Sequence, residues 1–303
     1  MQELLIILQS SPTSLTFLVL IIGLLIGSFL NVVIFRLPVM MERSWKNECI
    51  EYLEQDAKDS DPLQQSTTSS SLKAEPFNLM LPLSRCPSCN AAIKSYQNIP
   101  VISYLFLNGK CAECKTHISL RYPLIESFTG ITSAIVAWHF GFSSEMLFAL
   151  FLTWSLIALS FIDIDKQLLP DSITLPMLWL GLFLSLFSIY TDTYSSIIGA
   201  IAGYLTLWTV YQIFKLVTGK EGMGYGDFKL LSLFGAWLGW QYLPLIILLS
   251  SLVGAVIGIS MIILVKKDHN TPIPFGPYLA AAGWLALLWG DQINALYLST
   301  VGM

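Results

Sequence analysis

The sequence predicts an all-α protein that crosses a membrane about eight times and carries a small cytoplasmic insert. Charged residues make up only 12% of the 303 residues, whereas hydrophobic residues make up 54%. A soluble domain usually contains about 25% charged residues. The apolar residues also occur in runs of about 20, the length that an α-helix needs to cross the hydrocarbon core. These observations exclude a largely disordered chain and indicate a polytopic membrane protein.

Eight apolar runs, bounded by charged residues or by Pro and Gly turns, are the predicted spans. They are residues 14–35, 122–141, 145–162, 173–190, 195–217, 228–241, 244–265 and 277–298. The first run is not predicted to be a cleavable signal peptide. It lacks a preceding basic segment and leads into Asn31 and Arg36 instead of a small-residue cleavage site.

The Lys and Arg residues predict the orientation of these spans. All 16 fall in four places, which are Arg36 to Arg121, Lys166, Lys215 to Lys229, and Lys266 with Lys267. With eight spans, these places are the four loops on one face, and the opposite loops and both termini contain no Lys or Arg. The positive-inside rule therefore predicts that the four basic loops are cytoplasmic and that both termini lie outside. The net charge of −4 gives no indication of nucleic-acid binding.

The segment 36–121 differs from the rest of the chain because it holds ten Lys/Arg and nine Asp/Glu residues. We therefore predict a first transmembrane helix in 1–35, a cytoplasmic insert in 36–121 and a transmembrane core in 122–303. Within the insert, residues 39–54 are predicted to form an amphipathic helix on the membrane surface. The polar, Ser/Thr-rich residues 55–76 are predicted to be a flexible linker.

Two C-x-x-C pairs lie in the insert, Cys86 with Cys89 in CPSC and Cys111 with Cys114 in CAEC, with 21 residues between the pairs. Two such turns at this separation suit one tetrahedral Zn²⁺ held by four thiolates, as in a zinc ribbon. Disulfides rarely persist in the cytoplasm, and a small insert gains stability from a metal. A redox dithiol pair and merely unpaired cysteines are the alternatives. A metal with four thiolate ligands has no open position, so a structural role is predicted.

Two segments place carboxylates at the predicted cytoplasmic boundary of the membrane. FIDIDKQLLPD (161–171) follows the third span, and GMGYGDFK (222–229) precedes the sixth. Asp163 closes one apolar run and Asp227 opens another, and charged groups at that depth are costly enough to indicate function. If brought together, two carboxylates share a proton, so that one acts as an acid and the other as a base on water.

Structural roles for these carboxylates are the alternatives on spacing alone. Asp171 follows a proline at the start of the fourth span and is predicted to be a helix N-cap. Asp227 is compatible with a cap of the sixth helix, and Asp163 with a solvated group at a helix end. Glu126 lies one turn inside the second span and needs a partner, for which Arg121 and Lys229 are the candidates. Glu126 either forms a buried structural contact between helices or lies near the active site.

Together these motifs closely resemble the bacterial type IV prepilin peptidases, the bifunctional leader peptidase/N-methyltransferases that also serve type II secretion. The sequence contains neither H-E-x-x-H of metalloproteases nor G-x-S-x-G of serine hydrolases. The resemblance runs essentially from end to end. The matching segments are GSFLNVVIFRLP (27–38), CPSCN (86–90), GKCAECK (109–115), RYPLIE (121–126), FIDIDKQLLPD (161–171), GMGYGDFK (222–229) and IPFGPYLA (273–280).

The resemblance implies an intramembrane aspartic protease of the bacterial inner membrane whose two aspartates match Asp163 and Asp227. It implies removal of a short basic leader from prepilins and pseudopilins, followed by methylation of the new N-terminal amine with S-adenosylmethionine. Gly109 and Lys110 match residues that are tied to methylation in the bifunctional members. Both termini would then be periplasmic, with the cysteine insert and the active site at the cytoplasmic face.

Supporting roles and rival functions complete the sequence-based hypotheses. Lys229 is a candidate for biasing the aspartate pair electrostatically, and Glu126 for meeting the positive charge of the leader. One rival is a peptidase without methyltransferase activity. The other is a membrane transporter or assembly scaffold with a zinc-stapled cytoplasmic module, although no chain of polar residues crosses the predicted bilayer midplane.

Overall fold

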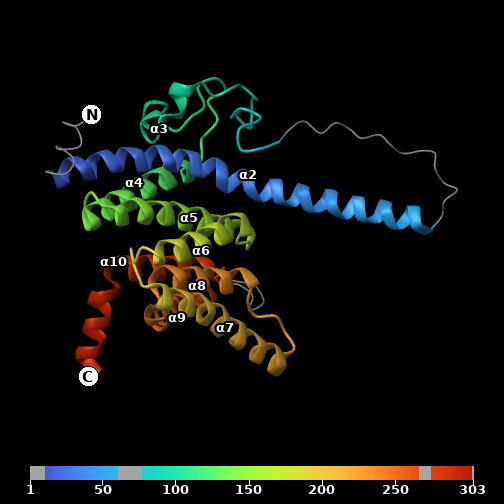
Figure 1. Ribbon diagram of the computed structural model, residues 1–303. Helices are drawn as coiled ribbons and strands as arrows, with labels where there is room; N and C mark the ends of the chain where they lie inside the picture. The colour runs from blue at the N-terminus through green and yellow to red at the C-terminus, as the bar shows by residue number, and fades with distance from the viewer. Residues whose placement is uncertain (1–10, 61–76, 266–273, 302–303) are drawn as a thin grey trace. The chain divides into compact units, whose positions relative to one another are not determined.

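The computed structural model describes residues 11–60, 77–265 and 274–301, which are predominantly helical and contain no β-strand (Figure 1). The helices in chain order are α2 (Pro12–Ser60), α3 (Ile102–Phe106), α4 (Arg121–Phe140), α5 (Ser144–Lys166), α6 (Asp171–Ser185), α7 (Thr193–Thr218), α8 (Tyr225–Leu238), α9 (Leu243–Val265) and α10 (Gly276–Val301), with short 3₁₀ turns η1 (Ser95–Asn98) and η2 (Trp240–Tyr242). The predicted all-α class is confirmed. Each of the eight predicted spans overlaps one described helix.

Four of the described helical segments are long and apolar enough to cross a membrane. They are Pro12–Leu53, Ser144–Lys166, Thr193–Thr218 and Trp240–Ser260. The helix α6 is apolar but shorter, and α8 has only 14 residues. The polytopic membrane class is therefore confirmed, whereas the number of eight spans stays a prediction.

The chain divides into two compact units. The core unit comprises Met1–Ile26 and Phe128–Met303, and the insert unit comprises Gly27–Ser127. The predicted linker segment 61–76 and the predicted basic pair Lys266 and Lys267 lie outside the described residues.

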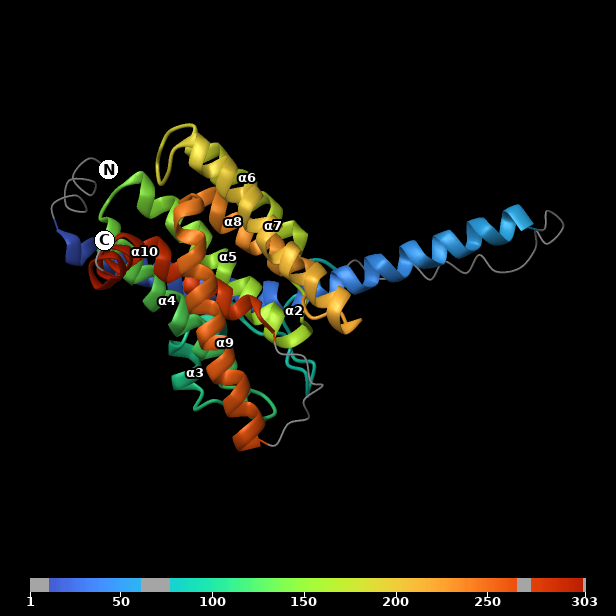
Figure 2. The same cartoon turned by 90° about the horizontal axis from the view of Figure 1, so that it is seen from below.

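Helix α8 is the innermost helix of the core unit. From Asp227 to Leu238 every residue except Lys229 is buried. The helices α6, α7 and α8 lie side by side in both views, and α7 makes the most extensive contact with α8 (Figures 1 and 2). This enclosure fixes the helix that carries Asp227 in its first turn.

Small residues allow α7 and α8 to approach closely. Gly199 and Gly235 face each other across this contact without room for a side chain on either. On both sides of the glycines, serine hydroxyls donate to carbonyls of the opposite helix, Ser196 to Ala236 at 2.6 Å and Ser232 to Ala200 at 2.7 Å. Close approach with interhelical hydrogen bonds is how membrane helices associate when lipid surrounds them.

Gly235→Ala is expected to destabilise the core unit by about 1–3 kcal/mol, because the new methyl group would overlap the carbonyl of Gly199. Thermal unfolding in detergent measures the effect. Gly254→Ala on α9 is the control, since its nearest neighbour would lie at an ordinary 3.4 Å. Equal melting temperatures for both variants would contradict the close α7–α8 packing.

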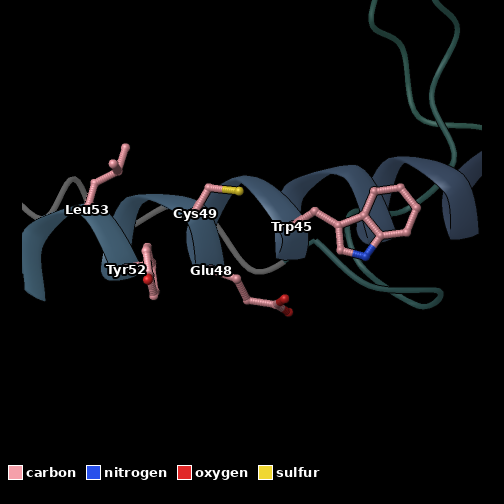
Figure 3. Close-up of a pocket in the computed structure, with 5 residues that line it drawn as sticks. All are labelled: Trp45, Glu48, Cys49, Tyr52 and Leu53. Carbon is pink, nitrogen blue, oxygen red and sulfur yellow. The ribbon is translucent and has the colours of Figure 1, made fainter. Parts of the chain in front are cut away.

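The insert unit begins within α2, at Gly27. In this helix the predicted surface helix 39–54 continues the first span without a break at Pro38. Residues 55–60 are also helical, so the predicted start of the linker at residue 55 was wrong. Adding residues to an existing helix requires no nucleation, which explains how a polar segment extends α2. Figure 3 shows Trp45, Glu48, Cys49, Tyr52 and Leu53, which line an open hollow on this helix.

Candidate active site and metal centre

Asp163 lies in the last turn of α5 and is buried. The helix ends where Gln167 adopts a left-handed conformation and donates its N–H to the Asp163 carbonyl at 2.8 Å. A carboxylate at a helix C-terminus meets the negative end of the helix dipole. The backbone N–H of Gly276, the first residue of α10, donates to Asp163 Oδ2 at 3.0 Å and offsets this cost.

Asp227 is the third residue of α8, after the N-cap Gly224. At the N-terminus of a helix the dipole favours a carboxylate. The side chain is nevertheless only 7% exposed, and Asp227 Oδ1 is buried without a hydrogen-bond partner among the described residues. A buried acceptor without a donor costs about 1–3 kcal/mol, so such atoms are rare outside functional sites.

The structure brings Asp163 and Asp227 together from α5 and α8, close enough for the two charges to repel each other. Two carboxylates in a common buried site retain one proton between them. One can therefore accept a proton from water while the other donates one, which is the requirement for hydrolysing a peptide bond without a metal or a covalent intermediate.

Packing around the pair involves two residues that the sequence interpretation did not single out. A methyl group on Gly276 would lie 2.7 Å from Asp163 Oδ2, and one on Gly226 would lie 2.7 Å from Leu169 Cβ. Gly276 contacts Asp163 through its backbone N–H, and Leu169 packs its side chain against Gly226 and Gly276. Neither has the reactive side chain by which sequence reasoning recognises a site.

Lys229 forms an ion pair with Asp171, with Nζ at 2.7 Å from both carboxylate oxygens. The pair joins α8 to α6. The prediction of Asp171 as an N-cap was wrong, because Pro170 holds that position and Asp171 is the first helical residue, with its side chain directed to Lys229.

The four predicted cysteine ligands lie together in the insert unit, with all Sγ atoms within 4.8 Å of one another. Two similar turns present them. Asn90 N–H donates to the Cys86 carbonyl and Lys115 N–H to the Cys111 carbonyl, and both donors are in the left-handed region. No disulfide joins these cysteines.

The cysteine cluster fits a tetrahedral metal ion. Four thiolates at about 2.3 Å from a metal are separated by about 3.8 Å, and Cys86 Sγ lies 3.8 Å from Cys114 Sγ. Hydrogen bonds from the Thr116 side chain and backbone lower the pKa of the Cys114 thiol to about 6, whereas burial and the neighbouring thiols raise the pKa of Cys89 to about 11. A cation bound among the four sulfurs would favour the thiolate form of all of them. The described residues can therefore hold a metal ion here.

Gly109 and Lys110 precede the third cysteine. Gly109 has φ +66°, and a methyl group there would lie 2.7 Å from the Tyr104 hydroxyl. Lys110 is exposed, and its backbone pairs with that of His117. A glycine is therefore required for the turn that presents the lysine beside the cluster.

Glu126 and Arg36 are buried charged residues of the insert unit. Glu126 Oε2 accepts the N–H of Val101 at 2.8 Å, which ties α4 to the loop before α3. Arg36 donates to the carbonyls of Asn78 at 2.9 Å and Pro82 at 2.5 Å. The sequence does not predict this role of Arg36, because its partners are backbone carbonyls, which every residue has.

Comparisons with known proteins cover both units. Residues 21–140 match the bacterial peptidase A24 N-terminal domain, and residues 150–259 match the type IV leader peptidase family. The chain is 56% identical over 295 residues to a prepilin leader peptidase/N-methyltransferase of Stutzerimonas stutzeri, covering 96% of each chain. It is 53% identical to the protein of that name from Pseudomonas aeruginosa, over 97% of each chain, and 42% identical to that from Legionella pneumophila, over 93% of this chain and 95% of the relative. No solved structure matches the chain.

Proposed function

The chain belongs to the type IV leader peptidase family, and from this premise we propose that it cleaves the leaders of type IV prepilins and methylates the new N-terminus. The relatives that carry both activities in their names align with nearly the whole chain. The observation that most directly supports peptidase activity is the buried pair of Asp163 and Asp227. Asp227 Oδ1 has no hydrogen-bond partner among the described residues. The pseudopilins of type II secretion are proposed as further substrates.

In the proposed mechanism the two aspartates hold one water against the scissile peptide bond. The pair contains one proton before attack. One carboxylate removes a proton from the water as its oxygen bonds to the carbonyl carbon, and the other carboxyl group protonates the carbonyl oxygen. When the C–N bond breaks, the proton taken from the water passes to the leaving amine, and the other carboxylate regains its proton from a hydroxyl of the tetrahedral intermediate, so the pair is restored.

The proposed setting is the bacterial inner membrane with the four basic loops in the cytoplasm and both termini in the periplasm. The charge distribution of the loops supports this orientation. A prepilin would then keep its apolar helix in the bilayer and present its basic leader to Asp163 and Asp227. In whole cells, a membrane-impermeant maleimide should label a cysteine introduced at Thr191 and spare one introduced at Lys220. The opposite result would reject the orientation.

We propose Zn²⁺ as the metal and S-adenosylmethionine as the methyl donor. Cys86, Cys89, Cys111 and Cys114 would hold the zinc as a structural ion. The methyl donor would supply the methyl group that the new N-terminal amine accepts.

Lys110 is proposed to support methylation, and Gly109 to shape the turn that presents it. Lys110→Ala is expected to lower the rate of methylation by at least about tenfold while cleavage continues, because a misplaced group near a transfer site has an effect of this size. Intact-mass measurement of the product follows both steps, and Lys115→Ala, which removes the lysine side chain on the other side of Cys111 and Cys114, is the control. Full methylation by Lys110→Ala would remove this assignment.

Glu126 and Lys229 are proposed as supporting residues, Lys229 by favouring negative charge on the aspartate pair and Glu126 by attracting the basic leader. Asp171 already neutralises much of the Lys229 charge. We therefore expect Lys229→Met to slow cleavage only several-fold and to change the free energy of unfolding by less than about 1 kcal/mol. Lys220→Met is the control. Glu126→Gln should raise KM for a basic leader, and unchanged kinetics in either variant would defeat the corresponding role.

The proposed function is tested by incubating the purified enzyme with a prepilin and S-adenosylmethionine in detergent and weighing the product. Loss of the leader together with the added mass of one methylene group is the expected result. Leader loss alone would leave a peptidase without methyltransferase activity. Absence of cleavage, with transport of a solute into liposomes, would favour the transporter alternative.

A further inference from the structure

The backbone N–H of Gly276 donates a hydrogen bond to Asp163 Oδ2 at 3.0 Å. Among the described residues it is the only donor to this carboxylate. Gly276 is the first residue of α10, and the first N–H groups of a helix have no partner within the helix. The Asp163 side chain, 113 residues earlier in the sequence, accepts the hydrogen bond of the first such N–H group. Its carboxylate therefore lies at the positive end of the α10 dipole.

The contact requires a glycine at position 276. A methyl group there would lie 2.7 Å from Asp163 Oδ2 and 3.2 Å from Leu169 Cδ2, both closer than van der Waals contact allows. Leu169 also packs against Gly226, the residue before Asp227. One leucine side chain thus lies between the glycine that faces Asp163 and the glycine that precedes Asp227, so the packing fixes the spacing of the two carboxylates.

The two aspartates differ in their hydrogen bonds. Asp163 Oδ2 receives an N–H at a helix N-terminus, which stabilises a negative charge. The Asp227 carboxylate lies in the first turn of α8 and has a backbone hydrogen bond with Gly224, but its Oδ1 is buried without a donor among the described residues, and burial without a donor disfavours a charge. Of the other charged groups near the pair, Lys229 and Asp171 neutralise each other, and Asp165 and Lys166 lie exposed at the end of α5.

We propose that Gly276 is a positioning residue that holds Asp163 in its ionised form as the base, leaving the shared proton on Asp227 as the acid. This inference rests on the proposed peptidase function. Water then gives its proton to Asp163 as its oxygen attacks the carbonyl carbon, and Asp227 protonates the carbonyl oxygen. On collapse, the C–N bond breaks, the leaving amine takes the proton from Asp163, and Asp227 regains its proton from the hydroxyl group that becomes the new carboxyl.

The test compares Gly276→Ala with Gly290→Ala in the cleavage of a purified prepilin. Both methyl groups would press on a side chain from α10, that at 276 on Asp163 and that at 290 on Tyr242 at 2.6 Å. Gly276→Ala is expected to lower kcat by about 10-fold to 100-fold with KM within about twofold. Gly290→Ala, with a similar loss of thermal stability, should keep the kcat of the wild type.

The pH profile separates positioning from general destabilisation. The methyl group in Gly276→Ala displaces the N–H of residue 276 from Asp163 and so destabilises the ionised carboxylate. The acidic limb of the kcat profile should therefore move up by about one pH unit. If that variant does not fold, replacing the amide before residue 276 by an ester removes the N–H without adding an atom and should give the same shift. A wild-type profile in the folded variants would overturn the inference. Absence of cleavage by the wild type would instead reject the proposed function itself.

Discussion

Asp163→Asn and Asp227→Asn should each lower the rate of leader cleavage by at least about 10³-fold. Asparagine has the shape of aspartate but can neither accept a proton from water nor hold the shared one, and general acid–base catalysis contributes about 10²–10⁴-fold for each group. The two losses should not add, because the aspartates act as a unit. Single-turnover cleavage in detergent, read by intact mass, measures both variants and the double variant.

Stability distinguishes loss of chemistry from loss of folding in these variants. Asp227 is buried with Oδ1 unpartnered among the described residues and is proposed to hold the shared proton, so Asp227→Asn replaces one neutral side chain by another of similar shape. Its free energy of unfolding should be equal to that of the wild type or higher by about 1 kcal/mol. Asp165→Asn, which changes an exposed aspartate in the same turn of α5 as Asp163, is the matched control and should cleave normally. Undiminished cleavage by either catalytic variant would refute the two-aspartate mechanism.

Removal of the metal from the cysteine cluster is expected to unfold the insert unit. Structural zinc contributes about 10–16 kcal/mol, which exceeds the stability of most domains. Cys86→Ser should therefore lose the metal and make residues 77–120 sensitive to limited proteolysis. Cys49→Ser is the matched control, because Cys49 is exposed and lies outside the cluster.

The two activities should respond differently to metal loss. Asp163, Asp227 and Gly276 all belong to the core unit, so cleavage should persist, whereas methylation should cease with the turn that carries Lys110. Elemental analysis and product mass follow the two effects. Retention of one metal ion per chain in Cys86→Ser, or intact methylation after complete chelation, would contradict the proposed zinc site.

Apolar runs predicted the helices well because burial in lipid or protein requires continuous hydrophobic segments. The number of membrane crossings stays a prediction. The run at 228–241, one of the predicted spans, corresponds to α8, whose apolar residues are enclosed by other helices. Residues 55–60 were assigned to a linker from their polarity, although a helix already begun at Pro12 extends into them.

The candidate site was predictable where a reactive side chain marks it. The aspartates and cysteines were recognised from their positions and spacing, and the resemblance selected Asp163 over Asp165. The interactions that orient these groups were not predictable. The N–H of Gly276, the carbonyls bound by Arg36 and the N–H that binds Glu126 are backbone atoms, which every residue possesses, so only the fold determines which of them is used.

The shortness of α8 has a consequence for how the enzyme responds to its lipid environment. Fourteen residues of α-helix extend about 21 Å, less than the hydrocarbon thickness of about 30 Å. Almost all of α8 from Asp227 onward contacts protein, so a thicker or thinner bilayer acts on the lipid-facing helices α7 and α9 and reaches α8 only through them. Hydrophobic mismatch should therefore tilt the outer helices at modest cost before it displaces the aspartate, which would let one enzyme work in membranes of differing lipid composition.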